Sequence, residues 1–227
     1  MQDSLNKSYY TNTRPEMLRY IPAQARTILD VGCATGIFGA AVKQQVPTAE
    51  VWGVEILPEV AAQARQRLDV VVNAPFDEAI DLPAHYFDVI VFNDCLEHLP
   101  DDRAALRLVK KFLKPETGRV VCSIPNVRYI DNLKHLLLDM DWCYEECGIR
   151  DKTHLRFFTR KSICRTFQET GYDIVQLEGI NSDWWWGKKM RLIDWMLKHR
   201  IEDTRYIQFA VIAAPATTRQ PLETQGA

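Results

Sequence analysis

Thr27-Ile28-Leu29-Asp30-Val31-Gly32-Cys33-Ala34-Thr35-Gly36 is the stretch that decides the fold. Its apolar half predicts a strand over residues 27–31, and a helix is expected over residues 36–45. The glycines of the turn, Gly32 and Gly36, let the backbone approach a ligand without a Cβ in the way. Ligands of open α/β sheets bind outside the carboxyl ends of the strands, where this turn lies. The stretch therefore predicts a ligand site on an α/β domain.

Strand-like and helix-like segments alternate around this stretch, as in a parallel sheet with helices on both faces. Further strands are expected over residues 50–54, 70–73, 87–93, 119–124, 172–177 and 206–213, and further helices over 14–20, 58–68, 101–112, 126–138, 159–171 and a run ending at 198. We expect one domain over residues 1–214, with lid or insert regions at about 126–158 and 181–203. The polar tail over 215–227 is expected to be disordered.

The composition argues against several classes of protein. The 227 residues suit one domain, and a formal net charge of −2 offers no basic field for a nucleic-acid backbone, so no nucleic-acid partner is expected. The six cysteines follow no disulfide or zinc-site spacing. Residues 1–7 lack the apolar core of a signal peptide, and no stretch reaches the roughly 18 apolar residues of a spanning helix. These features predict a protein of the reducing cytoplasm.

Two carboxylates flank the predicted ligand site. Glu55 ends the strand expected over 50–54, 19 residues after Gly36, where a carboxylate can accept the hydroxyl protons of a ribose. A helix-capping or surface charge is the alternative for Glu55. Asp30 precedes the first glycine, where it would repel a pyrophosphate but suit a ligand bearing an ammonium group. The turn also lacks the middle glycine of the G-x-G-x-x-G turn, which makes an NAD-dependent oxidoreductase the less favoured alternative.

Three motifs in this order carry a family resemblance: Asp30-x-Gly32-x-x-x-Gly36, Glu55, and Asp94-Cys95-Leu96-Glu97-His98-Leu99. Together they resemble class I S-adenosylmethionine (SAM)-dependent methyltransferases, in particular the branch that acts on small molecules. The resemblance covers about residues 10–214. It implies SAM as cofactor and a Rossmann-like, seven-stranded, mostly parallel sheet whose last strand runs antiparallel.

A narrower resemblance concerns the methyl acceptor. Ser123-Ile124-Pro125-Asn126-Val127 and Asp151-Lys152-Thr153-His154-Leu155-Arg156-Phe157-Phe158-Thr159 resemble bacterial methyltransferases of polysaccharide or glycan pathways. This resemblance implies a small-molecule acceptor, with oxygen on a sugar, a glycan, or a related or lipid-linked metabolite as the methylated atom. A SAM-binding protein without catalytic activity, which would serve to bind a partner, is the alternative.

The resemblance also implies which residues bind the cofactor. The methionine part of SAM would be bordered by Asp30, Gly32, Cys33 and Gly36, with Asn93 and Asp94 at the methionine end. Glu55 would hold the ribose and Ile56 would press on the adenine. The family usually has an acid just after the third strand, whereas this chain reads Val72-Asn73-Ala74-Pro75. Asn73 or a backbone group is therefore expected to replace that adenine contact.

His98 and His154 are the candidate catalytic residues. His98 follows the fourth strand on the cofactor side, and an unperturbed imidazole pKa of about 6.5 suits proton removal near neutral pH. Packing against the next helix is the alternative for His98, and a hydrogen-bond network that pins the loop is the alternative for His154. Asp94, Glu97 and His98 resemble a metal-binding arrangement of some quinone-pathway O-methyltransferases. Many relatives keep Glu-His without any metal, so no metal is expected here.

Two further segments have competing interpretations. Tyr9, Tyr10 and Arg14 precede the first helix and could cover the cofactor, but a surface arm is favoured. Trp184-Trp185-Trp186 and the apolar residues up to Leu197 could line an acceptor pocket or lie on a membrane surface. Packing of this apolar stripe on the domain or on a second subunit is favoured over both, which leaves a homodimer open.

Overall fold

The computed structural model describes residues 13–182 and 187–216. Its helices and strands follow one another as α1 Pro15–Leu18, β1 Thr27–Val31, α2 Ile37–Gln45, β2 Glu50–Val54, α3 Pro58–Ala64, β3 Val70–Val72, β4 Val89–Asn93, η2 Leu96–His98, α4 Asp102–Phe112, β5 Arg119–Pro125, α5 Ile130–Lys134, η3 His135–Asp139, α6 Arg160–Glu169, β6 Tyr172–Ser182, α7 Lys188–Met196, η4 Glu202–Arg205 and β7 Tyr206–Pro215. The predicted Trp184–Trp186 segment, Tyr9, Tyr10 and most of the predicted tail lie outside the described residues.

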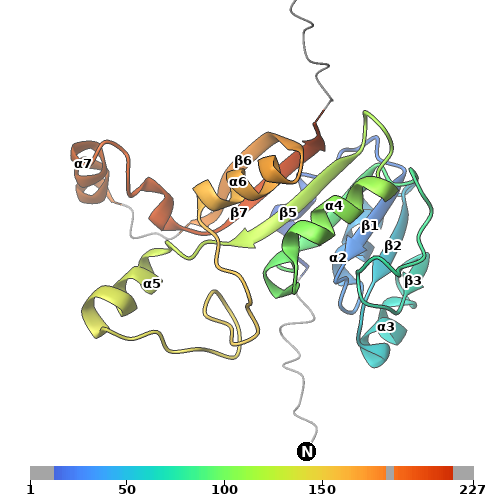
Figure 1. The fold of residues 1–227 in the computed structure, drawn as a ribbon, viewed down its shortest axis with the longest axis horizontal. Coiled ribbons are helices and arrows are strands. Elements are labelled where there is room, and N and C mark those ends of the chain that lie inside the picture. Colours follow the sequence, from blue (N-terminus) through green and yellow to red (C-terminus); the bar gives the residue numbers. More distant parts are fainter. Residues whose placement is uncertain (1–12, 183–186, 217–227) are drawn as a thin grey trace, which may run out of the picture.

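One seven-stranded sheet organises the chain, with the strand order β3-β2-β1-β4-β5-β7-β6 (Figure 1). Strands β1 to β5 pair in parallel, and β7 pairs antiparallel to both β5 and β6. The Rossmann-like α/β fold with an antiparallel last strand, expected from the sequence, is therefore confirmed. Because β1 to β5 are parallel, the segments that follow them all leave from one edge of the sheet, called here the carboxyl edge.

Helices cover both faces of the sheet because successive strand residues point to opposite sides. Leu29 of β1 belongs to a hydrophobic cluster that contains Leu106 of α4 and Phe167 of α6. The adjacent residue Ile28 belongs to a second cluster, which contains Met17 of α1, Phe38 of α2 and Ala64 of α3. The central strands are thus buried on both faces, as their continuous apolar sequences predict.

The boundaries differ from the predictions where tertiary contacts compete with helix formation. The helix expected over residues 126–138 begins only at Ile130. The Asn126 amide donates to the carbonyl oxygens of Asp203 and Tyr206, at 2.8 and 2.9 Å, and the Asn126 backbone N–H donates to Ile207. These bonds hold the chain in line with β7 rather than in a helix. Residues 126–158, called here the excursion, connect β5 to the region just before α6.

The sheet extends further than predicted at its antiparallel end. The strand expected over 172–177 continues to Ser182, and the strand expected over 206–213 continues to Pro215. The two strands pair along their full lengths, from Tyr172 opposite Pro215 to Ser182 opposite Tyr206, so each strand stabilises the extra residues of the other. The predicted tail therefore starts inside a strand.

Candidate active site

The turn between β1 and α2 has the close-packed geometry that its glycines predict. Gly32 and Gly36 adopt φ angles of 73° and 78°, in the left-handed region. A Cβ on Gly32 would lie 2.9 Å from the Cys95 Sγ, and a Cβ on Gly36 would lie 3.1 Å from the Ala64 Cα. The backbone N–H groups of Gly32 and Cys33 both donate to the Val54 carbonyl oxygen, at 2.9 and 3.0 Å. The turn is thus fixed against the end of β2.

The Cys33 side chain packs inside the turn, where its thiol donates to the Ala34 carbonyl oxygen at 3.7 Å. The side chain is buried, and its Sγ would lie 2.5 Å from a Cβ placed on Gly53 of β2. Burial raises the pKa of the Cys33 thiol far above its usual range. The thiol is therefore a neutral packing group. The predicted cofactor contact of Cys33 remains a prediction for its main chain alone.

Asp30 and Asn93 hold buried polar atoms for which the described residues supply no hydrogen-bond partner. Asp30 lies on β1 and is 2% exposed, with Oδ1 unsatisfied. Burial, and then the charge of Glu55, raises the pKa of the Asp30 carboxyl to about 7. At the end of β4, both the side-chain nitrogen and the side-chain oxygen of Asn93 are unsatisfied. A buried polar group without a partner is costly, so these atoms are candidates to bind a polar ligand at the carboxyl edge, and their predicted cofactor contacts stay predictions.

Glu55 lies beside them because β1, β2 and β4 end level with one another. Val31 is the register partner of both Val54 and Phe92, so Gly32, Glu55 and Asn93 follow at adjacent positions. The Glu55 carboxylate accepts from the backbone N–H of Ala34 at 3.1 Å and of Leu57 at 2.9 Å. These bonds fix its orientation, and a carboxylate has further lone pairs with which to accept ribose hydroxyls.

Asn73 and Ile56 occupy the outer end of this region. The Asn73 amide donates to the carbonyl oxygens of Glu55 at 2.7 Å and Ile56 at 3.0 Å, so its NH₂ group braces the loop after β2. The Ile56 side chain is exposed. An apolar side chain at this position is available to cover a flat ring. The adenine contacts expected of Asn73 and Ile56 stay predictions.

The Asp94 carboxylate is the centre of a hydrogen-bond network that the sequence did not indicate. Its carboxylate accepts from the guanidinium of Arg14, from the Gln208 amide at 2.8 and 2.9 Å, and from the Ser123 hydroxyl at 3.1 Å. Arg14 also donates to Ser123 at 2.8 Å and is buried. The surface arm favoured from the sequence is thus wrong for Arg14. The network joins the start of α1 to β5 and β7 beside the cofactor region.

Glu97, His98 and His154 form a second buried cluster at the carboxyl edge. The two imidazole rings lie 4.6 Å apart, and the His154 Nε2 lies 3.8 Å from a Glu97 carboxyl oxygen. One ligand atom from each of the three residues lies within 4.8 Å of the other two, so the cluster could hold a cation. His154 comes from the excursion, whereas Glu97 and His98 follow β4. Sequence reasoning selected both histidines separately, and the fold places them together.

Protonation in this cluster follows from burial. Glu97 is 1% exposed, neither of its oxygens has a hydrogen-bond partner among the described residues, and burial raises its pKa to about 8. Burial lowers the pKa of His154, and burial followed by the nearby His154 lowers the pKa of His98. Near neutral pH the carboxyl group is therefore mostly protonated and both imidazoles are neutral. Neutral imidazoles can accept a proton.

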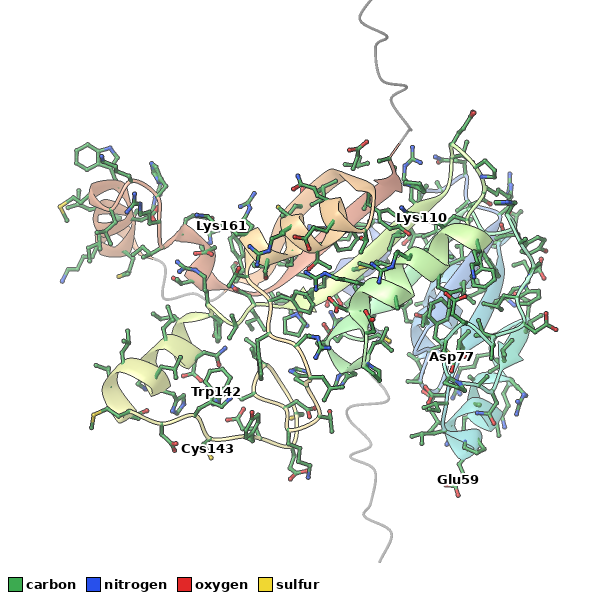
Figure 2. All side chains as sticks on the ribbon, in the orientation of Figure 1. Glu59, Asp77, Lys110, Trp142, Cys143 and Lys161 are labelled. Atoms are coloured by element: carbon green, nitrogen blue, oxygen red, sulfur yellow. The ribbon has the colours of Figure 1, made fainter. Side chains whose placement is uncertain are left out.

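Backbone and side-chain bonds hold the excursion over this cluster. The N–H groups of Leu155 and Arg156 donate to the Glu97 carbonyl oxygen, at 2.8 and 3.2 Å. The His154 Nδ1 lies 3.0 Å from the Ile149 carbonyl oxygen, which assigns the proton to Nδ1 and leaves Nε2 an acceptor. Figure 2 shows Trp142 on the outer loop of the excursion, away from the sheet. Its ring packs against Phe157 at 5.4 Å between centroids.

The sequence and the fold were compared with protein families, curated proteins and solved structures, and all three comparisons gave matches. Residues 6–177 match a family described as a methyltransferase domain. The ubiquinone biosynthesis O-methyltransferase of Neisseria meningitidis is 25% identical over 177 residues, which are 73% of this chain and 73% of that protein. The trans-aconitate 2-methyltransferase of Methylobacterium radiotolerans is 34% identical over 118 residues, 48% of this chain and 45% of that protein. A structure titled as a SAM-dependent methyltransferase from Archaeoglobus fulgidus superposes with a TM-score of 0.63 at 22% identity, covering 87% of this chain and 90% of that one.

Proposed function

The chain belongs to the family of methyltransferase domains, and from this premise we propose that it transfers a methyl group from SAM to an oxygen atom of a small molecule. One observation carries the proposal. The buried, unsatisfied Asp30 carboxyl oxygen lies on the strand that leads into the glycine turn, and Glu55 ends the neighbouring strand. A ligand with an ammonium group and a ribose would satisfy both carboxylates.

The residues present fit SAM. Asp30 and the unsatisfied Asn93 amide would meet the amino-acid end, Gly32 and Gly36 would let the backbone approach, and Glu55 would accept from the ribose. When bound, SAM supplies an electrophilic methyl group on a sulfonium, so the hard chemistry lies in the cofactor. The tasks left to the protein are to align the acceptor oxygen with the S–CH₃ bond, to exclude water, and to remove the hydroxyl proton.

His98 is the proposed proton acceptor, and His154 is the second candidate. When the methyl group of bound SAM is transferred to the acceptor oxygen, a neutral imidazole would accept the hydroxyl proton of the acceptor. The lowered pKa of both imidazoles keeps them neutral and ready to accept at physiological pH. A protonated Glu97, enclosed beside the His154 Nε2, would stabilise a His154 imidazolium by losing its own proton, which leaves a carboxylate beside the cation.

Calorimetry tests the cofactor half of the proposal. We expect SAM and S-adenosylhomocysteine to bind with micromolar-range dissociation constants. Asp30→Ala and Glu55→Ala should each weaken binding about tenfold, because each removes a charge-assisted hydrogen bond. NAD serves as the control ligand and should not bind. Absence of SAM binding to the unchanged protein would contradict the proposal, and NAD binding would revive the oxidoreductase alternative.

A screen with labelled SAM tests the acceptor half. The two relatives described above are named for a ubiquinone-pathway O-methylation and for trans-aconitate. Phenols, carboxylic acids and sugars therefore form three arms of the screen, and the sugar arm tests the glycan acceptor expected from the narrower resemblance. With the active acceptor, His98→Ala should lower turnover by about 10² to 10⁴-fold. SAM binding without any turnover would favour a binding protein that lacks catalytic activity.

A further inference from the structure

Exposed apolar residues gather on α7 and just after it, at one end of the molecule (Figure 1). Five of them are between 38% and 66% exposed: Leu192, Ile193, Trp195, Met196 and Leu197. The sequence favours packing of this stripe on the domain or on a second subunit. Packing on the domain is wrong for the described residues, because only Asp194 of the helix is buried, and packing on a second subunit stays a prediction. Figure 1 shows α7 projecting from the sheet beyond β7.

Asp194 fixes which side of α7 faces inward. Its carboxylate accepts from the backbone N–H of Ile201 at 3.0 Å and pairs with the His199 Nδ1 at 2.9 Å. Leu192 and Met196 are four residues apart and therefore share one side of the helix, which lies roughly opposite Asp194 at 100° per residue. The bonds of Asp194 join the helix to the turn that follows it, and they enclose the side of α7 opposite Leu192 and Met196. The exposed apolar side is thus left facing solvent.

Basic side chains border this apolar side. The segment from Lys188 to Arg200 contains five lysines and arginines, whereas its single acid, Asp194, is buried and bound. A helix with an outward apolar side, an aromatic residue and flanking cations has the composition of helices that lie in the interface of a bilayer. Each basic residue near an anionic lipid surface strengthens binding through attraction to the lipid phosphates.

A second apolar segment lies at the same end of the molecule. Leu137, Leu138 and Met140, in and just after η3, are 74%, 71% and 87% exposed. Figure 1 shows α5, which leads into η3, and α7 at the same end of the long axis. No helix in the described part of the chain has the length and apolar content needed to cross a bilayer.

We propose that α7, assisted by the η3 segment, docks the protein on an anionic lipid surface. The proposal does not depend on methyl transfer. Docking would bring the protein close to a lipid-linked methyl acceptor. Only this link to a lipid-linked acceptor rests on the proposed function. The apolar residues would lie among the acyl chains near the headgroups, and the lysines and arginines would contact lipid phosphates.

Vesicle sedimentation of the full chain tests the docking. We expect binding to vesicles of phosphatidylcholine with phosphatidylglycerol, weaker binding at high salt, and at least fivefold weaker binding to phosphatidylcholine alone. The double variant Leu192→Ser/Met196→Ser should bind at least fivefold more weakly. Both side chains are exposed, so its thermal unfolding should match that of the unchanged protein. Val175→Ser is the matched control, because Val175 is an equally exposed apolar residue on β6.

Two outcomes would overturn the docking proposal. In the first, neither vesicle composition sediments the protein. In the second, sedimentation velocity shows a dimer that Leu192→Ser/Met196→Ser dissociates, which would assign the apolar side to a second copy of the chain. Lys188→Glu/Arg191→Glu provides an independent variant that retains the apolar side. It should lose binding to anionic vesicles and leave SAM binding unchanged, whereas unchanged vesicle binding would count against the proposal.

Discussion

The turn after β1 and the excursion border the same edge of the sheet, but different forces hold them. Backbone hydrogen bonds to Val54 and close steric contact at Gly32 fix the turn. Within the excursion, charged side chains make the main contacts, chiefly buried Arg150, which donates to Asp131, Asn132 and Glu145. Backbone N–H groups of Leu155 and Arg156 then join the excursion to the Glu97 carbonyl oxygen. This difference suggests a rigid cofactor half beside an acceptor half whose contacts can change without disturbing the sheet.

The pH dependence of stability gives the largest expected effect. The pKa of Asp30 is about 7 in the folded chain, against an ordinary aspartate value of 3.8, so the unfolded chain loses this proton first as pH rises. Between about pH 4 and pH 7 the folded state binds more protons, so its stability falls as pH increases, by up to about 4 kcal/mol in the absence of cofactor. Asp30→Asn should remove this part of the pH dependence, so that its stability relative to wild type rises up to pH 7 and then levels off.

Denaturant unfolding at several pH values measures the effect of Asp30→Asn. Glu97 also has a raised pKa, so Glu97→Gln is measured in parallel and the two contributions are separated by difference. A constant stability difference between Asp30→Asn and wild type from pH 4 to pH 8 would mean that Asp30 is solvated in the cofactor-free protein. The interpretation of the turn as rigid and closed to solvent would then be incorrect.

Replacing one glycine of left-handed backbone conformation by alanine in each region compares the turn with the excursion directly. Gly32→Ala should lower the free energy of unfolding by about 2 kcal/mol, because it adds a Cβ 2.9 Å from the Cys95 Sγ to the strain of a positive φ. Gly148→Ala, in the excursion, has φ 89° but places the new Cβ in ordinary contact, 3.9 Å from the Glu145 Oε2, so about 1 kcal/mol is expected. Only Gly32→Ala should weaken SAM binding. Equal losses of stability and of SAM affinity in both variants would erase the distinction between the regions.

Loss of the Arg150 cation should separate catalysis from cofactor binding. Arg150→Met removes hydrogen bonds to Asp131 and Glu145, which are about half exposed, and leaves the buried Asn132 oxygen without this donor, so we expect about 2 kcal/mol of destabilisation. Limited proteolysis should become faster between residues 126 and 158, and methyl transfer should fall because His154 loses its support. SAM affinity should stay within about twofold, since no contact of the turn is changed.

Lys152→Met is the matched control for Arg150→Met. The side chains of Lys152 and its ion-pair partner Glu146 are both exposed, so this change should alter the free energy of unfolding by less than about 0.5 kcal/mol. A parallel loss of SAM affinity and turnover in Arg150→Met would show that the two halves of the site are one cooperative unit.

Removal of divalent cations gives the smallest expected effect. Although Glu97, His98 and His154 lie close enough to hold an ion, the proposed proton acceptor is an imidazole that needs none. Methyl transfer should therefore be the same before and after dialysis against EDTA. Loss of turnover in EDTA and its return with Zn²⁺ or Mn²⁺ would make the cluster a metal centre, with the metal lowering the pKa of the acceptor hydroxyl.

The sequence by itself determined the sheet and the position of its ligand edge. Apolar strands of regular spacing and a turn that requires Gly32 and Gly36 are local features, so their structure follows from a few neighbouring residues. Glu55 could be placed beside that turn because parallel strands end at a common edge. The lengths of β6 and β7 and the delayed start of α5 could not be predicted, since they depend on pairing between distant segments.

Only the tertiary structure decided how the polar residues at this edge combine. Sequence reasoning proposed Asp94 for the cofactor and Arg14 for a surface arm, whereas the fold binds the two together with Ser123 and Gln208. It also brought His154 from the excursion against His98 and placed the buried Glu97 carboxyl group beside His154. A side chain's partners and its burial set its pKa and its role, and in this protein both come from chain segments that are far apart in the sequence.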